Sequence, residues 1–84
     1  MQAVKETPQT DGSVVVENTA GIRLVVDRIQ YRDGEWGVSF QHQRITSKSS
    51  ELDALNIASV IAHTCATPDI DKMVTAAQAA YLQR

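Results

Sequence analysis

The sequence predicts a small α+β domain in which a three-stranded antiparallel meander is followed by two helices packed on one face (β-β-β-α-α). Two observations carry this prediction. An Asp-Gly step at residues 33–34 lies between segments of alternating apolar and polar residues, a pattern typical of a β-hairpin. The second half of the chain contains two segments with helical spacing of apolar residues, each preceded by residues that favour a helix start.

Length, charge and cysteine content limit the classes of protein to which the chain can belong. The 84 residues fit one domain, and the formal net charge of −2 argues against a strong nucleic-acid binder. Cys65 is the only cysteine, so no internal disulfide can form, and we expect a cytoplasmic protein. No apolar stretch reaches the length of about 18 residues that a membrane span needs, so we expect no membrane partner.

The first thirteen residues are polar and contain Pro8 and the Asp11-Gly12 step. Such a segment buries too little apolar surface to offset the entropy of ordering it. We therefore expect residues 1–13 to form a flexible polar arm and residues 14–84 to form a single α+β domain.

Three segments are expected to form strands. The first is the β-branched run at residues 14–16, and residues 18–21 then favour a turn because Gly21 tolerates a positive φ. The second strand covers residues 22–32 and the third covers residues 35–45. Together they predict an antiparallel meander.

A two-residue type I′ turn at the Asp-Gly step fixes the register of the predicted hairpin. It pairs Tyr31 with Trp36 and Ile29 with Val38, and it turns these side chains towards the core. It also requires a positive φ at both turn residues, which Asp and Gly tolerate best.

Continued alternation from that turn would place Asp27 on the inner face, opposite Phe40. A β-bulge at Asp27-Arg28 removes this conflict, and the sequence therefore predicts one there. The inward residues of the second strand are then Ile22, Leu24, Val26, Ile29 and Tyr31.

The first helix is predicted over residues 51–66. Ser50 followed by Asp53 resembles a capping box, and Ser49 is an alternative cap. The apolar arc of this helix spans roughly 220°, whereas a surface helix needs little more than about 100°. The first helix must therefore contact more than the sheet.

The second helix is predicted from Pro68 to the end of the chain, with Thr67 as N-cap and Asp69 and Asp71 in the first turn. Its alanines give a surface that another backbone could approach closely. Together with the wide apolar arc of the first helix, they predict self-association. The residues expected there are Ile57, Val60, Ala76, Ala79 and Ala80.

The outer face of the predicted sheet is rich in Arg and Gln. It is either a solvated face or a recognition surface, because both side chains donate several hydrogen bonds. The candidate partner-binding residues are Arg23, Arg28, Gln30, Arg32, Gln41 and Gln43.

No catalytic, metal or cofactor motif has the required spacing. His63 and Cys65 are two positions apart, so on a helix they point about 160° away from each other. The glycines form no phosphate-binding loop. We therefore expect no enzyme and no cofactor.

These observations favour a non-enzymatic, homodimeric protein-binding module such as a regulator, inhibitor or adaptor. The alternative is a nucleic-acid-binding domain that uses the basic outer face of the sheet, against which the net charge argues. A third hypothesis is an enzyme or small-ligand carrier with a cleft near His42 and Arg44, for which no motif argues.

Overall fold

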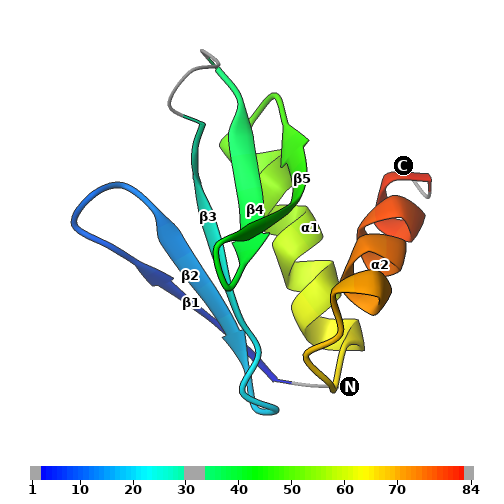
Figure 1. The fold of residues 1–84 in the computed structure, drawn as a ribbon. Coiled ribbons are helices and arrows are strands. Elements are labelled where there is room, and N and C mark those ends of the chain that lie inside the picture. The colour runs from blue at the N-terminus through cyan, green and yellow to red at the C-terminus, as the bar shows by residue number, and fades with distance from the viewer. Residues whose placement is uncertain (1–2, 30–33, 83–84) are drawn as a thin grey trace.

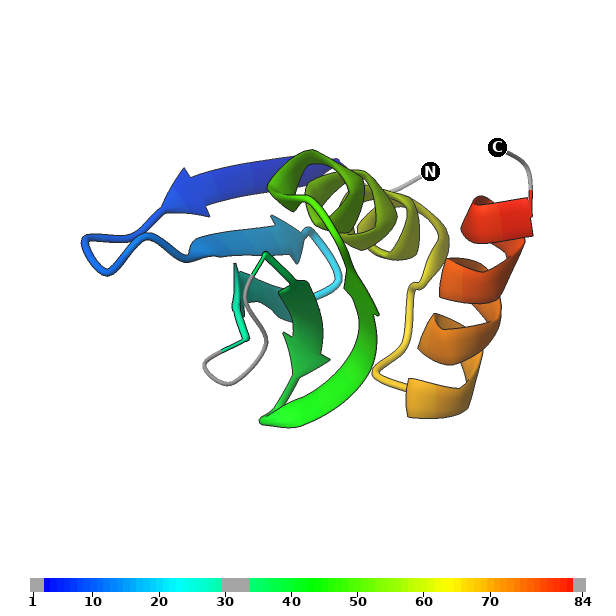
Figure 2. The same ribbon diagram turned by 90° about the horizontal axis from the view of Figure 1, so that it is seen from above.

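The structure, a computed structural model, describes residues 3–29 and 34–82. They form an α+β fold with a five-stranded antiparallel sheet in the order β1-β2-β3-β4-β5 (Figure 1). The strands are β1 (Val4–Pro8), β2 (Val14–Asn18), β3 (Arg23–Arg28), β4 (Trp36–Phe40) and β5 (Gln43–Lys48), and the helices are α1 (Glu51–Thr64) and α2 (Ile70–Leu82). The sheet curves, α1 lies across its inner face, and α2 packs beside α1 at the β5 edge (Figure 2).

The sheet has two more strands than the sequence predicted. One of them, β1, lies within the segment expected to be a flexible arm, and it pairs with β2 along its whole length. β1 is an edge strand in which only Val4 packs against the core, so its sequence lacks an apolar pattern. In the turn that follows, the Ser13 hydroxyl and amide donate to Asp11 Oδ1 at 2.6 and 2.9 Å, and these bonds lower the pKa of the Asp11 carboxyl.

The other additional strand arises because the predicted third strand is divided. Gln41 and His42 form a tight turn between β4 and β5, with φ values of 51° and 67°. Non-glycine residues rarely adopt this left-handed region, and neither Asn nor Gly marks the turn in the sequence. Reversal of the chain here brings Phe40 opposite Gln43.

The β3–β4 register also differs from the predicted one. Val26 pairs with Val38 and Arg28 pairs with Trp36, so the predicted pairs Ile29–Val38 and Tyr31–Trp36 are wrong. The Ile29 amide donates to the Glu35 carbonyl at 3.0 Å, which makes the connection longer than a two-residue turn. Gly34 has the expected positive φ of 77°, whereas Asp33 lies outside the described residues.

The longer connection makes the predicted bulge unnecessary. Pairing runs without a shift through Asp27 and Arg28, and the irregularity lies instead in the β4–β5 pairing between Val38 and Ser39. In this register apolar residues already face apolar residues on the inner side of the sheet. The inward orientation predicted for Ile22, Leu24 and Val26 is confirmed, since each of these residues is buried.

The core lies between the inner face of the sheet, α1 and one side of α2. The buried face of α1 follows helical spacing, and its alanines alternate with larger side chains. The buried cluster consists of Val16, Ile22, Leu24, Val26, Val38, Phe40, Ala54, Ile57, Ala58, Ile61, Ala62, Cys65, Met73 and Ala77.

The helix starts are set by side-chain caps. Ser50 Oγ accepts from the Asp53 amide at 3.1 Å, which confirms the predicted N-cap of α1. The predicted start of α2 is wrong by two residues. Asp69, not Thr67, accepts from the amides of Asp71 and Lys72, at 3.0 and 3.4 Å. The irregular residues between the helices give the chain room to cross from α1 to the β5 edge.

Asn18, at the end of β2, ties the sheet to the C-terminus of α1. Its side-chain Nδ2 donates to the carbonyls of Ala62 and Cys65, both at 2.9 Å. Its Oδ1 accepts from the amides of Ala20 and Ile22, at 2.9 and 3.1 Å. This buried amide thereby satisfies two carbonyls at the C-terminal end of α1 and two amides at the β2–β3 turn.

We expect Asn18→Ala to lower the free energy of unfolding by about 2–4 kcal/mol, because several backbone groups lose their partner in a buried position. Asn18→Asp should cost at least as much, since it places a carboxylate against two carbonyl oxygens. Urea denaturation measures both changes. Asn56→Ala, an exposed change on α1, should stay within about 0.5 kcal/mol of the wild type. An Asn18→Ala variant as stable as Asn56→Ala would contradict this role.

Candidate functional site: a polar concavity on the outer face of the sheet

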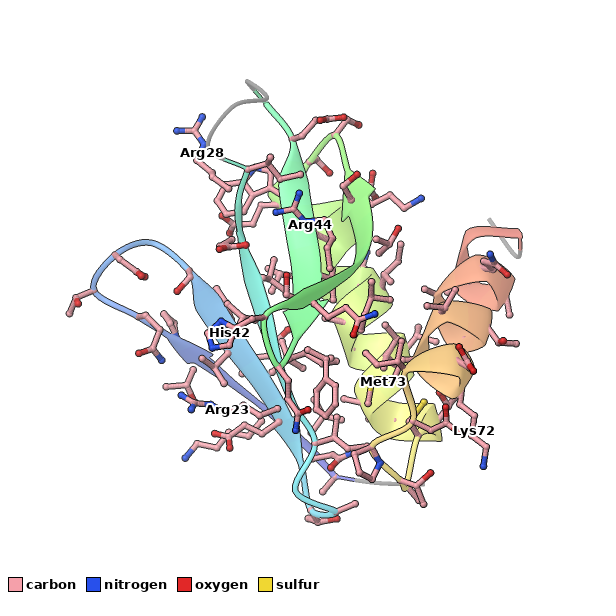
Figure 3. All side chains as sticks on the ribbon, viewed as in Figure 1. Arg23, Arg28, His42, Arg44, Lys72 and Met73 are labelled. Atoms are coloured by element: carbon pink, nitrogen blue, oxygen red, sulfur yellow. The ribbon has the colours of Figure 1, made fainter. Side chains whose placement is uncertain are left out.

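The face of the sheet that points away from α1 carries most of its charged residues. Strand alternation places Arg23, Val25 and Asp27 of β3 on this outer face, because Leu24 and Val26 point into the core. Ser39 of β4 pairs with Val25 of β3 and with Arg44 of β5, which places Ser39 and Arg44 on the same face. Figure 3 shows Arg23 and His42 on the side of the sheet away from the helices.

A concavity of about 780 Å³ opens on this face, near the β2–β3 and β4–β5 turns. Its floor contains Val25 and Ser39, which are directly opposite each other on neighbouring strands. We call it the outer-face concavity. It is lined by Gly21, Arg23, Val25, Asp27, Ser39, Phe40, Gln41, His42, Arg44 and Pro68.

Asp27 holds an unsatisfied acceptor in this concavity. Its carboxylate Oδ1 is buried and has no hydrogen-bond partner among the described residues. A buried polar atom without a partner costs about 1–3 kcal/mol, more when it is charged. Buried polar atoms in native proteins nearly always have a hydrogen-bond partner, and Asp27 Oδ1 departs from this rule.

Arg44 reaches over the neighbouring strand. A Cβ placed on Gly37 would lie 2.9 Å from Arg44 Nε, so the guanidinium occupies space that only glycine leaves open. Gly37 is the cross-strand partner of Asp27, which brings Arg44 to the Asp27 end of the concavity. Neither Arg44 nor Arg23 makes an ion pair with any residue in the described part of the chain.

The turn at Gln41 and His42 forms one wall of the concavity. Both residues are exposed, and both have the positive φ that L-residues adopt at a cost of about 1 kcal/mol or more each. The third sequence hypothesis placed a cleft near His42 and Arg44, and a concavity does lie there.

The predicted partner-binding residues separate in the structure. Arg23 and Gln41 line the concavity. Arg28 instead lies 5.9 Å from the ring centroid of Trp36, its pairing partner on the inner side of the sheet. Gln43 is exposed opposite Phe40, whereas Gln30 and Arg32 lie outside the described residues.

Sequence reasoning did not include Asp27 and Arg44 among the partner-binding residues of this face. The missing signal was the β4–β5 turn: once the chain reverses at residues 41–42, Arg44 moves to the outer face and Gln43 to the inner one. A polar residue at every position from 41 to 44 was the only hint of that reversal.

Most of the predicted self-association residues gather on a second surface. Val60, Ala76, Ala79 and Ala80 line a groove of about 660 Å³ between α1 and α2. Ile57 does not belong to it, since it is 2% exposed and lies in the core. We call this surface the helix groove.

The described residues contain no group of three or more His, Cys, Asp or Glu side chains placed to hold a metal ion. Cys65 lies in the core, as expected for a small buried side chain. No helix within the described ranges is long and apolar enough to cross a membrane.

No protein-family model, curated protein or solved structure matches the chain. The chemistry of the site therefore rests on its own groups. Two guanidinium groups and the His42 ring can donate or share hydrogen bonds, and the Asp27 carboxylate accepts them. This arrangement can bind a polar ligand, but it shows no nucleophile paired with a base.

Substitutions that relieve the strain at the β4–β5 turn should stabilise the protein. Gln41→Asn combined with His42→Gly supplies the residues that a type I′ turn prefers, so the free energy of unfolding should rise by about 1–2 kcal/mol. Chemical denaturation measures the change. The control is Gln43→Asn, a comparable change just after the turn, which should give no such gain. A fall in stability of the double variant would refute the strain.

Proposed function

We propose that the chain is a small non-enzymatic protein-binding module that docks its partner on the outer-face concavity. The observation that carries the proposal is the coincidence of three features in one place. These are the unpartnered Asp27 oxygen, the two left-handed residues of the β4–β5 turn, and the two arginines without ion pairs among the described residues.

The unpartnered Asp27 oxygen and the left-handed turn lower the stability of the sheet, and the two arginines add no ion pair that would raise it. The residues around these features pack in the ordinary way. Departures from local folding rules tend to collect where a protein binds or reacts. Arg in particular is enriched at protein interfaces, because its planar fork makes several hydrogen bonds at once. Partner binding accounts for the three features together, whereas a purely solvated face accounts only for the exposed arginines.

The alternative function, nucleic-acid binding, receives less support from the same face. Asp27 and Glu17 share the outer face with Arg23, and their carboxylates oppose a phosphate backbone. The aromatic side chains of β4, Trp36 and Phe40, belong to the inner face and offer no platform for base stacking.

Selection from a displayed random-peptide library tests the docking surface. Peptides that bind the wild type should lose at least tenfold in affinity against Ser39→Arg, which fills the floor of the concavity. They should bind Asn56→Arg unchanged, because Asn56 is exposed on α1. Selected peptides that bind Ser39→Arg and the wild type equally, in variants that fold alike, would rule out this surface.

We also propose that the module is a homodimer that pairs through the helix groove, with a second copy of the chain as occupant. α2 packs against α1 and β5, and its Ala79 side is exposed. Val60 on α1 is 36% exposed beside the small side chains of α2. Small side chains let two helices approach closely, and a two-fold axis lets one such surface serve both partners.

Sedimentation velocity tests the dimer. The wild type should sediment as a dimer at high micromolar concentration, and Ala79→Arg should shift it to the monomer by placing a long charged side chain in the groove. Gln78→Arg adds the same charge to the neighbouring exposed position of α2, outside the groove, and should leave the dimer intact. A wild-type protein that stays monomeric throughout would refute the proposal.

A further inference from the structure

We infer that the outer-face concavity binds the carboxylate of an Asp or Glu side chain in an extended segment of the partner. The inference rests on the proposed function and adds the chemistry of the ligand. It follows from the charges that line the concavity, from their spacing and from the one acidic group among them.

The cations supply the affinity. Arg23 and Arg44 line the same concavity, and neither is engaged in an ion pair with another described residue. A guanidinium binds a carboxylate through two parallel hydrogen bonds, which adds geometric specificity to the charge attraction. Their formal charge exceeds that of Asp27 by one, in a chain whose overall charge is −2. The concavity is thus a local site for a monoanion.

The spacing of the lining favours an extended segment over a small ion. Arg23 and Asp27 mark two ends of the β3 part of the concavity, four residues apart on one strand. At a rise of about 3.3 Å per residue, that span is roughly 13 Å, the length of about four extended residues. The half-buried Val25 between them gives the segment an apolar contact.

Asp27 limits which anions are accepted. Its carboxylate lies beside the position that Arg44 takes over Gly37, so it repels additional negative charge there. A carboxylate carries one negative charge and a phosphate carries up to two, so the repulsion weighs more against phosphate. Asp27 therefore acts as a specificity-determining residue, which discriminates by repulsion as well as attraction.

Gly37 acts as a positioning residue for Arg44. An alanine Cβ at this position would come within 2.9 Å of Arg44 Nε, and the flexible side chain would have to move. Gly37→Ala changes no charge, so any effect it has on carboxylate binding reports the position of the guanidinium.

Titration of the ¹⁵N-labelled full chain with three probes tests the inference. The probes are acetyl-Gly-Glu-Gly-amide, acetyl-Gly-Gln-Gly-amide and inorganic phosphate. We expect the Glu peptide to shift the amide signals of Val25 and Ser39 and to bind at least fivefold more tightly than the Gln peptide. Phosphate should bind the wild type more weakly than the Glu peptide.

Variants assign the effect to residues. Arg44→Gln, at the Asp27 end of the concavity, should abolish the preference for Glu over Gln. Arg23→Gln, at the opposite end, should reduce the preference, and Gly37→Ala should reduce it with no change in charge. Asp27→Asn should keep the Glu preference and increase the affinity for phosphate at least threefold. Lys5→Gln removes the same charge as the arginine variants from β1, outside the concavity, and should change nothing.

The outcomes separate the inference from the proposed function. Equal binding of the Glu and Gln peptides overturns the inference, even if library peptides still dock on the concavity. Loss of the preference in Lys5→Gln also overturns it, because the effect is then one of net charge. An unchanged phosphate affinity in Asp27→Asn refutes the role of Asp27. The signal dispersion of each variant shows whether it is folded.

Discussion

The hydrogen bonds of Asn18 are the constraint on which the arrangement of the molecule depends. The Asn18 side chain joins the β2–β3 turn to the C-terminal end of α1 through four hydrogen bonds, three of them buried and one partly buried. Apolar packing alone would let a helix slide over a sheet, whereas these bonds have one geometry. They fix where α1 ends, and so where the chain must turn to build α2 against the β5 edge (Figure 1).

The same link connects the fold to the proposed binding surface. Gly21, in the turn that Asn18 holds, and Pro68, in the connection that follows Cys65, both line the outer-face concavity. The inner side of the sheet therefore follows ordinary packing rules and supplies the stability. The outer side carries Asp27 and the strained β4–β5 turn, both of which lower the free energy of unfolding. The packing of the core offsets this loss.

The sequence predicts the fold class, the cap at Ser50 and the inward residues Leu24 and Val26, because apolar periodicity and capping are local signals. It does not predict β1, since an edge strand needs little apolar surface, nor the turn at residues 41–42, whose residues tolerate a left-handed conformation only under tertiary constraint. That turn also decides which of Gln43 and Arg44 faces outwards. Part of the candidate site therefore could not be predicted: the outward positions of Arg23, Ser39 and Gln41 follow from alternation, whereas those of Asp27 and Arg44 require the true register.

The central claim is that the concavity is strained in the unbound protein because it serves binding. The most direct test compares the free energy of unfolding, with and without a saturating library-selected peptide, for the wild type and the Gln41→Asn/His42→Gly variant. Binding to the folded state adds stability in proportion to affinity. The account predicts that the variant is more stable than the wild type without peptide and gains less stability from it. A variant that gains as much from the peptide as the wild type does would contradict the account.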